Sequence, residues 1–249
     1  MGSQVVRQSF NRAADSYDAA ARLQRRVCDL LATGLPARSP TALLDAGCGT
    51  GYGLDLLAAR WSTAQCVAAD FAPAMLKMTG GGICADIEAL PFAADAFDLY
   101  WSSLTWQWCN AGRAMSEAAR VLAPGGTLAI SSLAPGTLAE LDAAFAGADD
   151  HRHVLEFSPP EALRIAAAAA GFEDLHIEQR ALCLYHPDMA TLLRELQALG
   201  ANQVGGRRRP GLMGRHAWRR IEERYEVHRT DEGLPATFEV ILCYATKPT

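Results

Sequence analysis

Three glycines alternate behind an acidic residue: Gly47, Gly49 and Gly51 follow Asp45. Glycine allows a tight turn and lets backbone N–H groups approach a ligand without a Cβ in the way. The apolar run 42–44 predicts a buried strand before them, and the run 54–60 predicts a helix after them. Strand, glycine turn and helix together indicate a nucleotide-binding loop. The alternative is an ordinary strand-to-helix turn.

The spacing of these glycines separates two kinds of nucleotide site. A dinucleotide fingerprint is G-x-G-x-x-G, and its third glycine would fall on Tyr52. The chain instead has G-x-G-x-G, which resembles the cofactor loop of class I S-adenosylmethionine (SAM) methyltransferases. An NAD-dependent oxidoreductase is therefore disfavoured, and SAM is the expected cofactor.

Two more acidic residues end predicted strands. Asp70 closes the run 66–70, and Asp86 closes the run 83–86. A carboxylate at the tip of the second strand can accept hydrogen bonds from both ribose hydroxyls, and SAM carries a ribose. For Asp70 taken alone, a cap for the helix beginning at Pro73 is the alternative. The loop 86–92 looks like the adenine-binding loop of the same class, in which Asp86 accepts from the adenine amine and the next residue serves the ring.

Strands and helices alternate along the chain. The expected strands are 42–44, 66–70, 83–86, 97–103, 127–131, 172–180 and 238–245. This alternation predicts an α/β fold with a doubly wound, mostly parallel sheet that binds ligands at its carboxyl edge. The resemblance to class I methyltransferases implies a Rossmann-like sheet of seven strands in the order 3-2-1-4-5-7-6, with helices on both faces and an antiparallel last strand.

The same pattern divides the chain into segments. We interpret 1–40 as an N-terminal cap region, 41–180 as the SAM-binding core, 181–236 as a helical lid insertion on the acceptor side, and 237–249 as the last core strand. Within the first segment, residues 10–18 precede a predicted helix. They either cover the site or form a frayed terminus.

Three helix starts carry capping signals. Thr137 and Ser158 each open an S/T-x-x-E pattern typical of a capping box. Asp188 is expected to cap a further helix.

Four stretches resemble one family closely. They are FNRAADSYD (10–18), DIEALP (86–91), WSSLTWQWC (101–109) and LRELQALGAN (193–202). They look like the malonyl-acyl-carrier-protein O-methyltransferases of biotin synthesis, the BioC family, and the resemblance covers nearly the whole chain. The glycine loop is generic to the class, whereas the Trp-Gln-Trp-Cys and Leu-Gly-Ala-Asn stretches are more discriminating.

The resemblance implies that SAM methylates the free carboxylate of malonyl-acyl-carrier protein, giving the methyl ester and S-adenosylhomocysteine early in pimeloyl and biotin synthesis. A carboxylate needs no base because it is ionised at neutral pH. The implied cofactor site comprises Asp45, Gly47, Cys48, Gly49, Gly51, Asp70, Phe71, Met75, Asp86, Ile87 and Ser102. Two alternatives stay open: methylation of another small metabolite, such as a quinone precursor, and a non-catalytic SAM-binding module.

A malonyl carboxylate in a pocket needs a cation or good hydrogen-bond donors. Arg152 is the first candidate for the cation, because the family tends to carry an Arg near this stretch; a surface loop residue is the alternative. Tyr17 and Ser102 are the candidate hydroxyl donors, which makes these three the expected catalytic residues. His151 and His153 lack a third ligand, so no metal is expected.

Two groups of side chains can each be interpreted in two ways. The tryptophans Trp101, Trp106 and Trp108 either wall the pocket or pack in the core. Arginines gather in the predicted lid, and a basic face formed by Arg207, Arg208, Arg209 and Arg215 would suit an acidic carrier protein. The alternative is a solvated helix face whose arginines pair with neighbouring glutamates.

Composition limits the remaining possibilities. A chain of 249 residues with half of them apolar fits one domain with an insertion. Its net charge of −5 argues against nucleic acid as a partner. No apolar run approaches a membrane span or a signal-peptide core. The seven cysteines form no C-x-x-C pair, which is typical of reduced thiols in a cytoplasmic protein.

Overall fold

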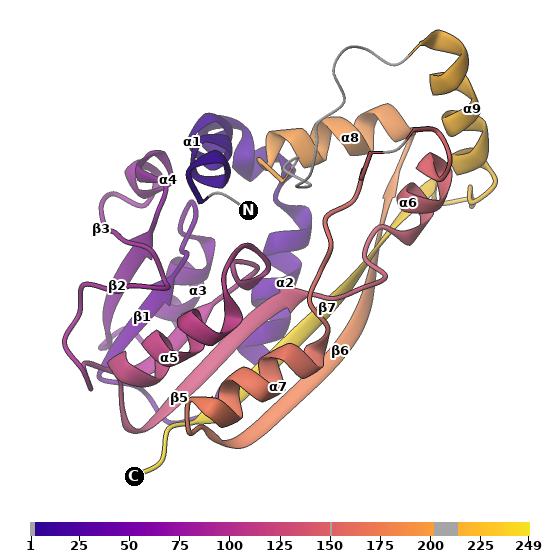
Figure 1. Cartoon of the computed structure of the whole chain (residues 1–249). Coiled ribbons are helices and arrows are strands. Elements are labelled where there is room, and N and C mark those ends of the chain that lie inside the picture. Colours follow the sequence, from indigo (N-terminus) through magenta and orange to yellow (C-terminus); the bar gives the residue numbers. More distant parts are fainter. Residues whose placement is uncertain (1–2, 150, 202–213) are drawn as a thin grey trace.

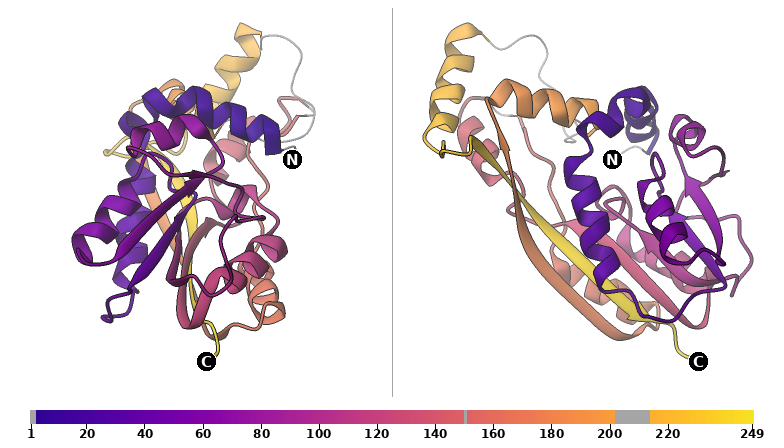
Figure 2. Two further views of the ribbon diagram at one scale, coloured as in Figure 1. Left: turned by 90° about the vertical axis from the view of Figure 1, so that its left-hand side faces the viewer. Right: turned by 180° about the vertical axis from the view of Figure 1, so that it is seen from behind.

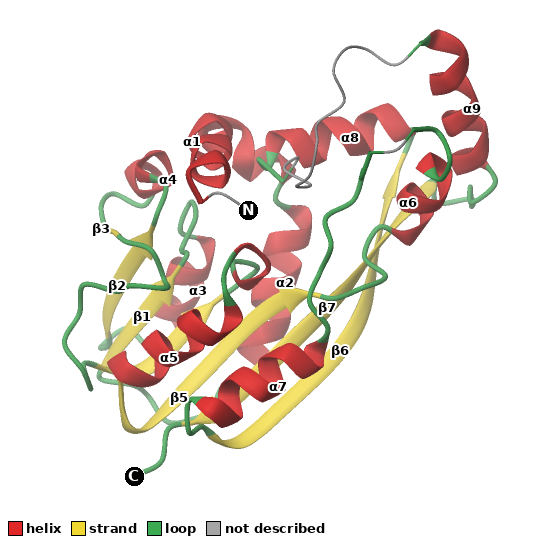
Figure 3. Ribbon diagram, in the orientation of Figure 1, coloured by secondary structure: helices red, strands yellow, loops and turns green. Residues whose placement is uncertain are grey.

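The computed structural model describes residues 3–149, 151–201 and 214–249. A seven-stranded sheet organises them in the order β3-β2-β1-β4-β5-β7-β6 (Figures 1 and 3). Its strands are β1 Ala42–Ala46, β2 Gln65–Asp70, β3 Ile83–Cys84, β4 Phe97–Ser102, β5 Leu122–Leu133, β6 Glu173–His186 and β7 Leu234–Thr246. Only the pairings of β7 with β5 and β6 are antiparallel. The predicted fold class and strand order are confirmed.

Helices cover both faces of the sheet. Helices α2 (Arg22–Thr33) and α3 (Tyr52–Arg60) lie on one face, and α5 (Ala111–Val121) and α7 (Pro160–Ala169) lie on the other (Figures 1 and 2). Because successive strand side chains point to opposite faces, Leu43 packs with the first layer and Leu44 with the second. Both leucines are fully buried, so the sheet is held from both sides.

The N-terminal segment is helical almost from its start. Helix α1 (Ser3–Ala20) runs along the end of the sheet where the parallel strands finish, beside the short helix α4 (Pro73–Met78) (Figure 2). The stretch 10–18 therefore lies inside a helix, whereas we expected it to precede one. The apolar side of α1 packs on Met75 and Phe71.

The last two strands form a long two-stranded arm. They pair from Glu173 opposite Thr246 to His186 opposite Leu234. Strand β6 therefore continues past Arg180, where we expected it to end. The arm carries α8 (Met189–Ala198) and α9 (Arg215–Glu226), and α9 packs beside α6 (Ala139–Phe145). Within the described residues, no helix is both long enough and apolar enough to cross a membrane.

The capping signals had mixed outcomes. Asp188 caps α8 as expected, since its side chain accepts a backbone hydrogen bond from the first turn. The two capping boxes are wrong. Glu140 does not reach back to the start of its own helix, because its carboxylate accepts hydrogen bonds from the backbone and hydroxyl of Thr237 in β7. The hydroxyl oxygen of Thr137 likewise accepts a hydrogen bond from the backbone of β7. Helix α7 begins without the side-chain cap expected at Ser158.

Candidate active site

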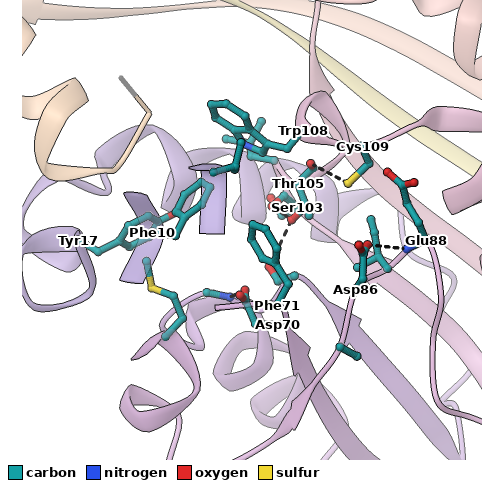
Figure 4. A pocket seen from close by; sticks show the side chains of 17 residues that line it. Phe10, Tyr17, Asp70, Phe71, Asp86, Glu88, Ser103, Thr105, Trp108 and Cys109 are labelled. Atoms are coloured by element: carbon teal, nitrogen blue, oxygen red, sulfur yellow. Dashed lines mark hydrogen bonds between the residues drawn. The ribbon is translucent and has the colours of Figure 1, made fainter. Parts of the chain in front are cut away.

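A cavity lies at the carboxyl edge of the parallel strands, walled on one side by α1 (Figure 4). It encloses about 710 Å3 of space, part of which is open to solvent. The structure brings together at this cavity the following residues expected in the site: Tyr17, Gly47, Gly49, Asp70, Phe71, Met75, Asp86 and Ile87.

The glycine loop uses its own amides to bind β2. The N–H groups of Gly47 and Cys48 both donate to the carbonyl of Ala69, at 2.7 and 3.0 Å, and the N–H of Gly49 donates to Asp70 at 3.0 Å. We expected these amides to face a ligand, and that expectation is wrong, because the neighbouring strand already accepts from them. The glycine instead lets the loop pack closely against the loop after β4, because a Cβ on Gly47 would lie 2.2 Å from Oγ1 of Thr105.

Asp70 combines burial with spare acceptor capacity. Its carboxyl oxygens accept from the N–H groups of Gly49 and Ala72, at 3.0 and 2.7 Å. Burial raises its pKa, and the two backbone N–H groups partly offset that effect. Each carboxylate oxygen has two lone pairs, so both can still accept from a ligand hydroxyl in the cavity.

The loop after β3 contributes two acidic residues to the cavity. Oδ1 of Asp86 accepts from the N–H of Glu88 at 3.0 Å, and Oε1 of Glu88 accepts from the N–H of Asn110 at 2.6 Å. Glu88 thereby ties this loop to the loop that follows β4, and both loops line the cavity. From the sequence we named Glu88 only as a solvated turn residue and did not include it among the expected site residues; its place two residues after Asp86 was the available signal.

Aromatic side chains close the cavity on the side of α1. The ring of Phe10 meets Phe71 and Trp108 edge to face, with centroids 6.1 and 5.7 Å apart. Figure 4 shows these rings over the cavity, with Tyr17 entering beside Phe10. Trp101 and Trp106 are instead buried in the core. Of the three tryptophans weighed from the sequence, Trp108 is the one that lines the cavity.

Three other residues expected to bind the cofactor are absent from the lining of the cavity. Asp45 is 2% exposed, and neither it, Cys48 nor Gly51 lines the cavity. Desolvation, followed by the charge of Asp70, raises the pKa of Asp45 to about 8. Its Oδ2 has no hydrogen-bond partner. Gly51, at a φ of 98°, is the N-cap residue of α3.

Two expected catalytic residues lie away from the cavity. Ser102 is fully buried and donates to the carbonyl of Ala46 at 2.6 Å, and the next residue, Ser103, lines the cavity in its place. Arg152 lies in the loop between α6 and α7, where its guanidinium pairs with Glu156 at 2.8 Å. The remaining candidate, Tyr17, does line the cavity, and burial raises its pKa, so its phenol stays neutral.

The charge of the cavity limits what it can hold. Three acidic residues line it, Asp70, Asp86 and Glu88, and among its described lining residues there is no Lys, Arg or His. Such a set favours a ligand with hydroxyl and amine donors and a positive charge, and it disfavours a pyrophosphate. These residues therefore fit SAM better than a dinucleotide.

Comparisons with known proteins agree with this chemistry. A family described as "Methyltransferase domain" matches residues 44–130. The malonyl-[acyl-carrier protein] O-methyltransferase of Dechloromonas aromatica (strain RCB) is 48% identical over 245 residues, which cover 97% of this chain and 94% of that protein. The biotin biosynthesis bifunctional protein BioHC of Cellvibrio japonicus (strain Ueda107) is 40% identical over 252 residues, 98% of this chain and 50% of that protein.

A solved structure supports the fold. Phosphoethanolamine N-methyltransferase 2 of Haemonchus contortus, in complex with SAM, superposes with a TM-score of 0.59 at 17% identity, covering 96% of this chain and 57% of that one. At that identity the likeness concerns the fold alone. The sequence relationship is far closer and spans nearly the full length, and from it we conclude that this chain belongs to the malonyl-[acyl-carrier protein] O-methyltransferase family.

Proposed function

We propose that this protein transfers a methyl group from SAM to the free carboxylate of malonyl-acyl-carrier protein, giving the methyl ester and S-adenosylhomocysteine, in an early step of pimeloyl and biotin synthesis. One observation carries the proposal. The chain is 48% identical to a malonyl-[acyl-carrier protein] O-methyltransferase over 97% of its length. The acidic cavity at the strand tips is consistent with a positively charged methyl donor.

Different residues of the cavity would bind different parts of SAM. Asp70 would accept from the ribose hydroxyls, while Asp86 and the backbone of Ile87 would hold the adenine. Phe71 and Met75 supply apolar surface beside it. When bound, SAM supplies a methyl group on a positively charged sulfur, which keeps the electron pair of the breaking C–S bond as the carboxylate oxygen bonds the carbon.

The acceptor needs positioning and not deprotonation. A carboxylate is already ionised at neutral pH, so no proton has to be removed before transfer. This requirement agrees with the described lining of the cavity, which carries no His or Lys to serve as a base. The protein contributes by aligning the carboxylate and by excluding water behind the rings of Phe10, Phe71 and Trp108.

For the carrier protein, we propose a docking face that includes α9. Arg215 and Arg220 are exposed on this helix, whereas Arg219 pairs with Glu223 at 3.4 Å. Arg207, Arg208 and Arg209, also expected in this face, lie outside the described residues. Reversing the charge of Arg215 and Arg220 should slow association with an acidic carrier, chiefly at low salt. Equal association rates at low and high salt would contradict this docking face.

We also propose that the reaction takes place in the cytoplasm. All seven cysteines are free thiols in the structure. A protein with seven free thiols and no disulfide among them is typical of a reducing compartment.

The function is tested by product mass. Purified protein is incubated with SAM and malonyl-carrier protein, and the carrier is analysed by mass spectrometry. We expect one added methyl group on the malonyl chain, and none on acetyl-carrier protein, which lacks the carboxylate. Methylation of a quinone precursor without any of malonyl-carrier protein would contradict the proposal. Binding of SAM without turnover of either acceptor would indicate a non-catalytic module.

A further inference from the structure

Two serines form a hydrogen-bonded pair beside the cavity. Ser103 follows β4 and lines the cavity, whereas Ser131 lies in the neighbouring strand β5 and is fully buried. Their Oγ atoms are 3.1 Å apart. In Figure 4 Ser103 lies near Thr105 among the lining side chains, between the rings contributed by α1 and the acids of the loop after β3. The cavity wall therefore has a hydroxyl with a buried partner behind it.

A backbone hydrogen bond from Leu104 determines which of the two serines donates to the other. The N–H of Leu104 donates to Oγ of Ser131 at 2.9 Å, and Leu104 has a left-handed φ of 50°. The Ser131 oxygen thus accepts from the backbone, and its own hydrogen needs an acceptor because a buried donor is costly to leave unpaired. The Ser103 oxygen is the acceptor that the structure places within reach. With Ser131 donating to Ser103, the hydrogen of Ser103 is not used within this pair.

A second buried side chain also hydrogen-bonds with Ser103. It is Cys28 in α2, whose pKa the bond with Ser103 lowers in part but burial raises overall to about 12, so the sulfur stays protonated. A thiol is a weak hydrogen-bond acceptor. A ligand carboxylate in the cavity would therefore be the stronger partner for the Ser103 hydrogen.

Few other lining groups can donate to an anion. The hydroxyl of Thr105 already donates toward the carbonyls of Gly47 and Ser103, each at 3.3 Å. The acidic side chains cannot donate when ionised. Among the described lining residues, the side-chain hydroxyls left for an anionic acceptor are those of Ser103 and Tyr17.

We propose that Ser103 binds the acceptor carboxylate by donating a hydrogen bond, and that Ser131 is a positioning residue that sets the direction of this donation. The inference rests on the proposed function, because it names the group that recognises the malonyl carboxylate. The carboxylate is then held by neutral donors, and its counter-charge is the positive charge of the methyl donor. No arginine is needed, and the carboxylate keeps the negative charge with which it attacks.

The test separates recognition of the carboxylate from recognition of the rest of the substrate. Ser103→Ala, Ser131→Ala and the wild type are assayed with malonyl-carrier protein, with acetyl-carrier protein as a competitive inhibitor that lacks the carboxylate. A hydrogen bond to a charged group predicts that Ser103→Ala raises the malonyl KM about ten- to a hundredfold. The inhibition constant of acetyl-carrier protein and the affinity for S-adenosylhomocysteine should stay within about twofold.

Two further variants guard against a purely structural effect. Ser132→Ala removes a buried hydroxyl next along β5, where the side chain points to the opposite face, and should leave both constants unchanged. Ser103→Thr restores a hydroxyl and should recover part of the malonyl KM. Ser131→Ala should raise the malonyl KM by less than Ser103→Ala, again without changing inhibition by acetyl-carrier protein.

Several outcomes would overturn the inference without touching the proposed function. An active wild type with an unchanged malonyl KM in Ser103→Ala would do so. Equal rises in the malonyl KM and the acetyl inhibition constant would show that the loop, and not carboxylate recognition, had been damaged. A raised malonyl KM in Arg152→Ala together with a silent Ser103→Ala would move the carboxylate to the loop between α6 and α7. A wild type that never methylates malonyl-carrier protein would instead refute the proposed function.

Discussion

Thr50 in the glycine loop donates a hydrogen bond to Asp18 in α1, with 2.6 Å between Oγ1 and Oδ1. A second tie joins α1 to α4, where Oδ1 of Asn11 accepts from the N–H of Ala74 at 2.9 Å. These contacts hold in place the helix that contributes Phe10 and Tyr17 to the cavity. We therefore expect these two hydrogen bonds to slow the release of a ligand bound beside α1.

Removing the first tie should speed ligand release. In Asp18→Ala the hydroxyl of Thr50 loses its acceptor, so we expect S-adenosylhomocysteine to dissociate about two- to tenfold faster. Stopped-flow tryptophan fluorescence, to which Trp108 in the cavity lining contributes, measures this rate. Asp29→Ala is the matched control, because Asp29 accepts from the hydroxyl of Tyr52 at 2.9 Å between α2 and α3. Identical dissociation rates in the two variants would show that the tie does not control release.

Asp70 should matter for affinity more than any other lining acid. Asp70→Ala removes the acceptor proposed for the ribose and frees the amides of Gly49 and Ala72, so we expect binding of S-adenosylhomocysteine to weaken about ten- to a hundredfold. Titration calorimetry gives the affinity, and thermal unfolding without ligand shows whether the loop still folds. Asp55→Ala, on the exposed side of α3, is the control. A folded Asp70→Ala protein with unchanged affinity would refute the ribose role.

The sequence predicted the fold and much of the cofactor side for one physical reason. Alternating strands and helices constrain parallel strands to end at one edge, so residues such as Asp70 and Asp86, at or just beyond strand ends, had to meet there. The amphipathic pattern also determined which elements cover the sheet. These properties depend on periodicity, which a single sequence shows directly.

The acceptor side could not be predicted in the same way. Ser102 and Ser103 are neighbours of the same type, and only the end of β4 and the left-handed turn at Leu104 decide which hydroxyl faces the cavity. The ion pair between Arg152 and Glu156 could not be predicted from the sequence either. The two residues are four positions apart in a loop, and whether they meet depends on how that loop folds. Both outcomes rest on local backbone conformation and not on residue type.

Glu88 should act through the bond it makes and not through its charge. Glu88→Ala removes the acceptor for the N–H of Asn110 and uncouples the two loops that line the cavity, so we expect a rise in the KM for SAM and a fall in kcat of about three- to tenfold each. Glu88→Gln keeps a carbonyl oxygen at the same place and should restore most of both constants. Equal losses in Glu88→Gln and Glu88→Ala would assign the effect to the charge instead.

Asp45 should make the stability of the ligand-free protein depend on pH. Desolvation, followed by the charge of Asp70, raises its pKa from the ordinary 3.8 to about 8 in the folded protein. Between these values the folded state holds a proton that the unfolded chain has released. The free energy of unfolding therefore falls as pH rises, by up to about 1.4 kcal/mol per pH unit from this group alone. Below pH 3.8 Asp45 is protonated in both the folded and the unfolded state, so it no longer makes the free energy of unfolding depend on pH.

Asp45→Asn isolates this contribution. The amide has nearly the same shape and cannot titrate, so the variant should lose less stability between about pH 5 and 8 and should exceed the wild type at the upper end. Burial also raises the pKa of Asp70, which the variant keeps, so a reduced slope remains. Urea unfolding at several pH values measures both curves, with Asp55→Asn on the exposed side of α3 as the control. Parallel curves for Asp45→Asn and the wild type would mean that Asp45 is not the group that takes up the proton on folding.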